Sequence, residues 1–345
     1  MKRISALSGI ALLFAASFVG AEEAQLIRFG ELTAGDDGQH AETVLDYSVH
    51  AGSGFTEEEK GMMRTSYAIQ NWGVVLNNSA RGIVADRLTT ARPVESTFRG
   101  ETVMGVRIHF PSSGSNNAHA TVRPPFPVPA IDPAILEEGP AEDGEVRNYF
   151  DENPFLNRGI VSNVGVLKIV EMNIRGLNFP HNVSILLERI GGRVEEIPMG
   201  SLDFDGWKTL SWTNPSYAFE VRQRDLRRLP VYPYTVPYIK LNGIRFYRSG
   251  QNMGGDFIAY IQDIVLVYDK AVRDDVPVDI DDEAIWNIIR DRELARMRLE
   301  MRRLGERQVF EFAQQRLMDT TRPQTFPAHG AIPVNDRVTS PEAAN

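Results

Sequence analysis

Hydrophobic and polar residues alternate with a period of two over much of the chain. In the segment KIVEMNIRGL, which covers residues 168–177, Val170, Met172 and Ile174 fall on one face and polar residues fall between them. Successive side chains of a strand point to opposite sides, so this pattern predicts a half-buried β-strand.

Further strand-like segments lie on both sides of this one. The pair Gly191-Gly192 separates two apolar runs and is typical of a two-residue β-hairpin. Many short strands without intervening helices predict a mainly β fold, namely an antiparallel β-sandwich of the jelly-roll or galactose-binding-like kind. The segments are NWGVVLNN (71–78), ETVMGVRIHFP (101–111), SILLERIGGRVEEIPMG (184–200), YIKLNGIRFYRS (238–249) and DFIAYIQDIVLVYD (256–269).

The sandwich domain is expected over residues 44–270, after an N-terminal segment at 22–43. Seven of the twenty prolines lie in residues 123–154, together with the acidic stretch EEGPAEDGE. Proline cannot donate to a strand ladder, so these residues are predicted to form a surface insert or a linker inside the domain.

The period becomes helical after residue 280, and a C-terminal helix is predicted within 280–318, starting near Glu283. Gly305 is expected to weaken this helix. The polar, proline-containing residues 319–345 are expected to be a disordered tail. Aspartates at the start offer an N-cap and acidic first-turn residues that suit the helix dipole: Asp279, Asp281 and Asp282.

This helix carries a narrow apolar stripe among many arginines. Residues 290–307 contain seven arginines and four acidic residues, a local charge of +3. Two arrangements are open. The helix could lie on its own acidic domain, or it could dock on a neighbouring subunit through arginine and methionine contacts. The stripe consists of Leu294, Met297, Met301 and Leu304, and the candidate assembly surface consists of Arg296, Arg303, Arg307, Met297 and Met301.

The N-terminus has the pattern of a secretory signal peptide at residues 1–21. Lys2 and Arg3 precede an apolar stretch, and small residues lead to a predicted cleavage between Ala21 and Glu22. The apolar run is shorter than the roughly 20 residues that a membrane-spanning helix needs. We therefore expect an exported, periplasmic protein without a membrane span.

Charge and cysteine content exclude several classes of site. The net charge is −9, and removal of the two positive charges in residues 1–21 leaves −11. Nucleic-acid binding relies on basic residues that neutralise phosphates, so an acidic chain argues against it. The chain has no cysteine, which excludes disulfides, thiolate zinc sites and lipoprotein anchoring.

Two tryptophans in GSLDFDGWKTLSW (200–212) raise the possibility of a sugar-binding platform. On one strand Trp207 and Trp212 would point to opposite faces, so they cannot form one stacking surface. Trp212 is therefore expected in the core and Trp207 over a sheet edge, with Trp72 as a third structural aromatic residue. A sugar platform would need other aromatic residues from neighbouring strands.

No pattern in the sequence supports catalysis or metal binding. His109 and His119 lack the spacing of a zinc pair, and DDVPVDIDDE lacks the glycine and spaced ligands of a calcium loop. GGDF at 254–257 precedes a strand and is interpreted as a hairpin turn. No nucleophile elbow, phosphate loop or dinucleotide fingerprint is present, so we expect no enzyme, no metal and no cofactor.

The order of several segments resembles the outer-layer, or sheath, protein of spirochaete periplasmic flagellar filaments, the FlaA family. The resemblance spans residues 40–300. It is carried by NWGVVLNNSAR (71–81), VMGVRIHFP (103–111), VRPPFPVPA (122–130), IPMGSLDFDGW (197–207), FYRSGQNMGGDFIAYIQDIVLVYD (246–269) and DIDDEAIW (279–286).

The resemblance implies a structural subunit without catalytic residues. Such a protein crosses the inner membrane by a signal peptide and coats the core flagellin filament within the periplasm, beside other sheath subunits. It helps to set the shape and stiffness of the filament. The alternative is a periplasmic carbohydrate-binding module of the jelly-roll type.

Overall fold

The computed structural model describes residues 21–95, 100–112, 117–131, 153–226, 237–250, 254–271 and 288–321. The predicted signal peptide up to residue 20, most of the acidic insert, the three N-cap aspartates and the tail from residue 322 lie outside the described residues.

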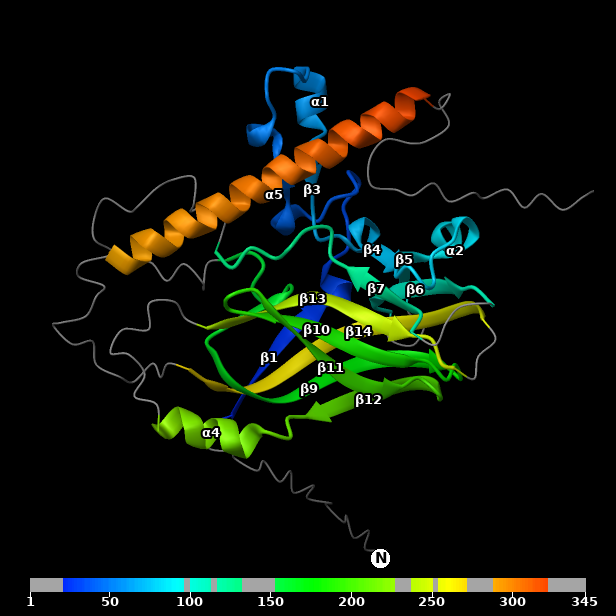
Figure 1. The fold of residues 1–345 in the computed structure, drawn as a ribbon, viewed down its shortest axis with the longest axis vertical. Helices are drawn as coiled ribbons and strands as arrows, with labels where there is room; N and C mark the ends of the chain where they lie inside the picture. Colours follow the sequence, from blue (N-terminus) through cyan, green and yellow to red (C-terminus); the bar gives the residue numbers. More distant parts are fainter. Residues whose placement is uncertain are drawn as a thin grey trace, which may run out of the picture.

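The described residues form two antiparallel sheets that face one another (Figure 1). In the first sheet, β1 and β6 lie end to end along one side of β14, and β9 lies along the other side. The order is β12 (Asp205–Thr213), β9 (Val164–Leu177), β14 (Gly255–Lys270), β6 (Thr102–Phe110) and β5 (Thr90–Glu95), with β1 (Ala21–Arg28) paired to β14.

The second sheet has the order β11 (Arg193–Ser201), β10 (Asn182–Arg189), β13 (Tyr238–Tyr247), β7 (His119–Arg123) and β4 (Gly73–Leu76), with β8 (Ile160–Ser162) paired to β13. The short strands β2 (Leu45–Asp46) and β3 (Arg64–Thr65) pair separately. The helices are α1 (Glu57–Gly61), α2 (Ile83–Leu88), α4 (Tyr217–Leu226) and α5 (Ile288–Thr321), with 3-10 turns η1 (Phe29–Glu31), η2 (Ala41–Thr43), η3 (Ser48–His50) and η4 (Ile69–Asn71).

The predicted mainly β fold with a C-terminal helix is confirmed. In β9 the residues predicted to face inward are fully buried and the polar ones between them are half-buried. The sheet starts earlier than residue 44, because β1 lies in the predicted N-terminal segment and pairs with β14 from Ala21↔Asp269 onward. Helix α5 continues to Thr321, so the first residues of the predicted tail are helical.

Two turns predicted from the sequence, at Gly191-Gly192 and at GGDF, differ in outcome. The hairpin between β10 and β11 is confirmed, although its connection has three residues, and both Gly191 and Gly192 adopt positive φ. The hairpin predicted at GGDF is wrong, because β13 and β14 belong to opposite sheets. Gly254 and Gly255, both at positive φ, instead lead the chain from one sheet to the other.

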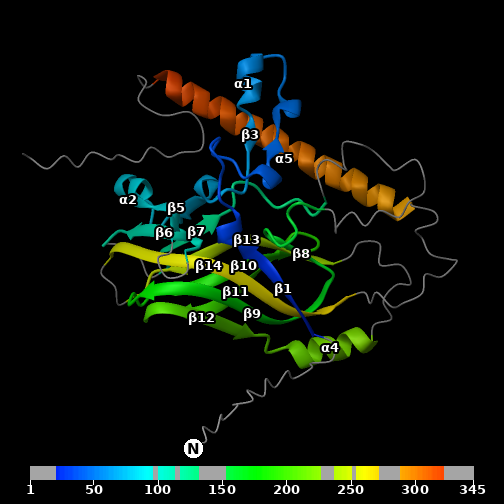
Figure 2. The ribbon, with the colours of Figure 1, turned by 180° about the vertical axis from the view of Figure 1, so that it is seen from behind.

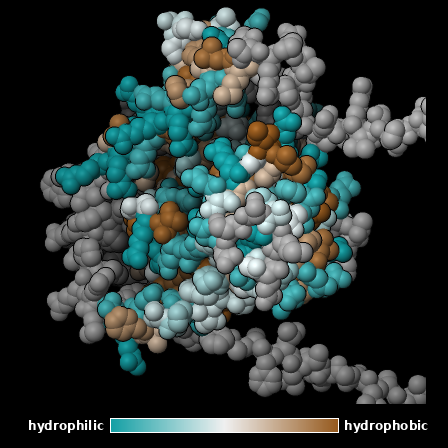
Figure 3. Space-filling model, turned by 45° about the vertical axis from the view of Figure 1, so that its right-hand side comes forward, coloured by the Kyte–Doolittle hydropathy of each residue, from teal (hydrophilic) through white to brown (hydrophobic). Residues whose placement is uncertain are grey.

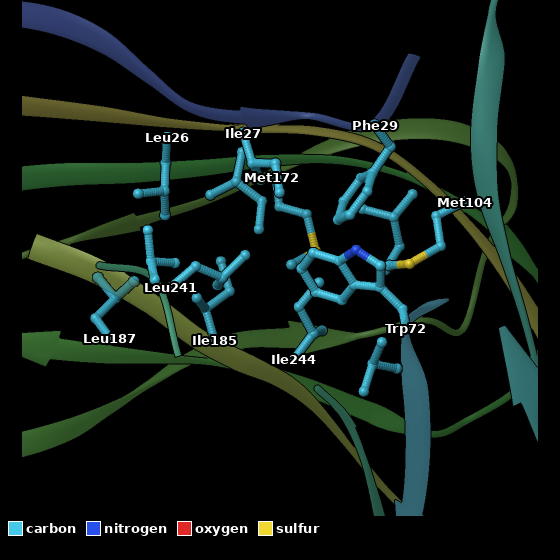
Figure 4. Packing of buried hydrophobic residues seen from close by; sticks show 14 of the residues in the cluster. Leu26, Ile27, Phe29, Trp72, Met104, Met172, Ile185, Leu187, Leu241 and Ile244 are labelled. Atoms are coloured by element: carbon cyan, nitrogen blue, oxygen red, sulfur yellow. The ribbon is translucent and has the colours of Figure 1, made fainter. Parts of the chain in front are cut away.

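The inward-facing side chains of both sheets form one hydrophobic core (Figure 4). Trp72 lies in this core beside Phe29, with ring centroids 5.4 Å apart in an edge-to-face arrangement. Its indole Nε1 donates a hydrogen bond to the carbonyl oxygen of Tyr67 at 3.0 Å. The one polar atom of the ring is therefore satisfied inside an apolar environment, which is what a buried tryptophan requires.

Helix α5 crosses one side of the sandwich together with α1, while α4 lies at the opposite end (Figures 1 and 2). Its first half packs on the main core through Leu294 and Met297. Its second half packs on the N-terminal region in a small separate cluster of Tyr47, Met63 and Phe312. Arg316 closes this end with an ion pair to Glu59 at 2.6 Å.

Gly305 marks the place where α5 crosses η3. A Cβ atom at this position would overlap Cδ2 of the His50 ring. The described helix continues through Gly305 without a break, so this glycine permits the close approach of α5 to η3 and does not end the helix.

His181 is a buried histidine among aromatic rings at the end of the sandwich. Its ring lies 4.8 Å from that of Phe257, and its Nδ1 accepts a hydrogen bond from the Ser249 N–H at 3.0 Å. Burial, with a smaller effect from the charge of Arg248, lowers the pKa of His181 to about 4. The folded protein therefore holds this imidazole neutral.

The free energy of unfolding should fall as the pH drops from about 6.5 towards 4, by up to about 3 kcal/mol from His181 alone. The unfolded chain binds a proton on this histidine in that range, whereas the folded chain does not. Above about pH 6.5 the contribution is fully present. Urea denaturation of the wild type and His181→Gln across this range tests it. The stability difference between them should shrink with falling pH, and a constant difference would contradict the prediction.

The substitution Gly305→Ala should destabilise the docking of α5, although alanine favours helix by about 1 kcal/mol. The added methyl group would overlap the His50 ring, and such overpacking costs about 1–3 kcal/mol. The double variant Gly305→Ala/His50→Ala should recover the loss. Urea denaturation of the two single variants and the double variant gives the coupling energy, and additive effects would show that the two residues do not meet.

Candidate assembly surface

The three arginines of the candidate assembly surface lie exposed on α5. Arg296 and Arg307 each form an ion pair with a glutamate one turn later, Arg296–Glu300 at 3.8 Å and Arg307–Glu311 at 3.6 Å. Exposed pairs of this spacing contribute only about 0.3–0.5 kcal/mol. The side chains are thus ordered along the helix but remain available to a partner.

The two methionines of the candidate surface lie against the chain itself. Met297 is buried in the main core, and Met301 is half-buried against it. Of the two arrangements left open by the sequence, the structure shows the helix on its own domain. Met297 and Met301 therefore hold α5 in place, and the exposed part of the candidate surface is its arginines.

A hollow of about 380 Å³ lies between α5 and the sandwich. Residues 127–131 form an apolar wall on the sandwich side, and Met297, Met301 and Leu304 form the wall on the helix side. Five charged side chains line the hollow: Glu188, Lys240, Glu300, Arg303 and Arg307.

Lys240 is a buried lysine on β13 beneath the helix. Its Nζ lies 4.0 Å from a carboxylate oxygen of Glu188 and 5.1 Å from the centre of the Tyr238 ring. Burial lowers the pKa of Lys240, and the charge of Glu188 opposes that shift. Sequence reasoning did not identify Lys240, because the alternation of side chains along a strand does not show which face of the sheet a helix covers.

The tryptophans of β12 point to opposite faces of the first sheet. Trp212 packs against the core on the inner face, whereas Trp207 is half-buried on the outer face of the edge strand. Trp207 pairs with Arg175 of β9, and Arg175 pairs with Tyr260 of β14. An indole, a guanidinium group and a phenol therefore form one row across three adjacent strands.

Two polar atoms in this row are buried without a hydrogen-bond partner, Nε1 of Trp207 and Nε of Arg175. The neighbouring row carries Thr209, Asn173 and Asp263, and Asn173 donates to Asp263 at 2.6 Å. Tyr260 thus lies on the same face as Trp207 but two strands away, with Arg175 between them, an arrangement that sequence reasoning did not identify.

The histidines considered for metal binding have separate partners. His109 lies 2.9 Å from a carboxylate oxygen of Asp256, which also accepts from Arg107, while His119 contacts the Asn117 carbonyl oxygen. Among the described residues, no group of three or more histidine or acidic side chains could hold a metal ion. Within that same part of the chain, no helix is long and apolar enough to cross a membrane.

The chain has relatives along most of its length. It is 44% identical over 324 residues to the flagellar filament outer layer protein of Spirochaeta aurantia, covering 92% of this chain and 94% of that one. The protein of the same name from Treponema pallidum (strain Nichols) is 37% identical, covering 93% and 95%. That of Borreliella burgdorferi is 28% identical, covering 71% and 67%.

Solved structures give a more distant likeness. A family 11 carbohydrate-binding module from Clostridium thermocellum overlays 60% of this chain and 91% of its own, with a TM-score of 0.25 and 14% identity.

The family model described as flagellar filament outer layer protein FlaA matches residues 36–276, more than half of the chain. The matched region takes in both sheets apart from β1. With two relatives above 30% identity over nearly the whole length, the chain belongs to the FlaA family of flagellar filament outer layer proteins.

Proposed function

We propose that the protein is a structural subunit of the outer layer of a periplasmic flagellar filament. The observation that carries this proposal is the family match over residues 36–276, together with relatives named for that role along nearly the whole chain. The subunit coats a core flagellin filament beside other sheath subunits and tunes the shape and stiffness of the filament for motility.

The architecture suits a mechanical role. Two packed sheets form a rigid body, and α5 is fixed to it by contacts near both ends of the helix. Side chains on α5 are therefore held at constant positions relative to the sandwich. When a subunit repeats along a polymer, each contact can be weak, because the other contacts raise its effective concentration.

Export by a signal peptide is part of the proposal. Cleavage between Ala21 and Glu22 would remove only the first of the seven residue pairs between β1 and β14. Glu22 would keep its ion pair with Lys270 at 3.1 Å. The mature chain would then begin directly with a strand of the first sheet, in the periplasm.

Reversing three exposed arginines, as Arg296→Glu/Arg303→Glu/Arg307→Glu, should reduce coating of bare core filaments about tenfold or more at moderate salt. The altered helix loses its positive surface but keeps Leu294 and Met297 in the core, so the fold should remain. Co-sedimentation and filament diameter in electron micrographs measure the coating.

The matched control is Arg81→Glu/Arg87→Glu/Arg92→Glu, which makes the same change of net charge at exposed arginines around α2 and β5. It should coat like the wild type. If the α5 variant also coats normally, these arginines take no part in assembly. If the wild type does not pellet with core filaments at any salt concentration, even with periplasmic extract added, the proposed function is wrong.

A second candidate function is glycan binding on the outer face of the first sheet. The row of Trp207, Arg175 and Tyr260 favours it, since flat aromatic faces and adjacent polar groups suit a sugar ring. Trp207→Ala should then abolish any glycan-array or peptidoglycan signal. The control Phe219→Ala, which removes an exposed aromatic ring on α4, should not. No signal from the wild-type protein would dismiss this candidate.

A further inference from the structure

Helix α5 carries a second apolar line on the side that faces away from the domain. Leu299, Phe310 and Leu317 are 49%, 62% and 64% exposed. They are separated by 11 and 7 residues. With 3.6 residues per turn, the three therefore align within about 20° around the helix axis and extend over about 27 Å.

This outer line lies opposite the line that holds the helix on its own domain. Buried Met297 and half-buried Met301 project about 160° away from Leu299 around the axis. Figure 3 shows a mostly hydrophilic surface on which hydrophobic residues gather in small separate patches. Single exposed apolar residues are common, but an aligned row on one helix is typical of a contact surface.

Positive charge accompanies the outer line. Arg292 lies seven residues before Leu299, and Arg303 lies seven residues before Phe310, so both fall within about 40° of Leu299 around the axis and both are exposed, although Arg303 also borders the hollow. Glu306 lies on this side as well, where it pairs with Arg302 at 2.9 Å, so the side remains net positive. The partner surface should therefore be acidic and should offer small apolar contacts. A contact between two α5 helices would bring two net-positive surfaces together, which is unfavourable.

The same chain carries a surface of the required chemistry. Residues 42–62, called here the acidic segment, contain five acidic residues and one lysine. Glu42, Asp46 and Glu59 form ion pairs with arginines outside the segment, so the negative charge left for a partner lies at Glu57 and Glu58, with Lys60 2.8 Å from Glu57. Three apolar side chains in this segment are exposed, Val44, Val49 and Met62. It includes α1, which lies beside α5 (Figures 1 and 2), and η3, which contacts α5, while the three residues of the outer line remain exposed.

We propose that copies of this chain contact one another head to tail, the outer line of α5 in one copy packing on the acidic segment of the next. Two different surfaces that meet in this way generate a ring or an open array, and not a two-fold symmetric dimer. The inference rests on the proposed function, because it assigns one of the contacts by which sheath subunits would adjoin along the filament.

Charge exchange between the two surfaces provides the test. Arg292→Glu/Arg303→Glu on α5, and Glu57→Arg/Glu58→Arg on the acidic segment, should each lower coating of core filaments about tenfold or more. An equimolar mixture of the two variants should restore coating, because each reversed surface then meets an opposite charge in its neighbour. Thermal unfolding confirms that each variant is folded, and Glu59 is left in place to hold Arg316.

Cross-linking gives a second readout, since the chain contains no cysteine of its own. Chains with Phe310→Cys and chains with Val49→Cys, mixed on core filaments and oxidised, should form disulfide-linked pairs. Phe219→Cys on α4 replaces an aromatic residue of similar exposure at the other end of the molecule, and it should not link to Val49→Cys. Preferential linking of Phe310→Cys chains to one another would show a symmetric contact and overturn the inference.

The outcomes separate this inference from the proposed function. If the wild type coats filaments and both charge-reversed variants coat equally well, the head-to-tail contact is wrong and the sheath role stands. If the acidic-segment variant alone coats normally, α5 meets another surface, such as the flagellin core, and the inference is again wrong. If the wild type does not coat filaments, the proposed function itself fails.

Discussion

The pairing of β14 with three other strands is the constraint on which the larger sheet depends. Its 16 residues meet β9 on one side, and β6 followed by β1 on the other. Ile261, Ile264 and Leu266 on its inner face are fully buried between the two sheets. One strand thus joins residues 21–28, 102–110 and 164–177, and the core forms only when all of these segments are in register.

The attachment of α5 follows from this scaffold. The helix contacts the main core in its first half and the N-terminal region in its second half. Gly305 lets it approach η3 between these contacts. A helix held at two places presents the side chains of its opposite side at fixed positions. A partner must therefore match the shape of that side.

Strand periodicity was sufficient to predict the sandwich and the orientation of β9. It did not predict β1, because AEEAQLIR has only a short apolar run and becomes a strand by pairing with β14, 240 residues away in the chain. Strand β14 shows a second case in which simple alternation does not predict the buried positions. Phe257, Ala259 and Ile261 face inward, but the bulge at Gln262 moves the inward positions to Ile264, Leu266 and Tyr268.

The candidate site was also predicted only in part, because a sequence pattern identifies a face of a helix or strand but not what packs against it. The apolar spacing of Leu294, Met297, Met301 and Leu304 identified one face of the helix, but spacing alone does not tell what that face meets. The alternation of side chains along a strand correctly predicted that Trp207 and Trp212 lie on opposite faces of the sheet. The neighbours of Trp207 depend on the pairing register of β9 and β14, which a single sequence does not reveal.

Among the described residues the first strand pairs with the last, and this has a consequence for the order in which the chain can fold. A polypeptide emerging from the ribosome cannot complete the sheet until residue 269 is available, and α5 comes later still. Contacts between such distant segments form slowly compared with local ones. A chain connected in this order therefore completes its first sheet only after β14 has been made, so this sheet forms late relative to synthesis.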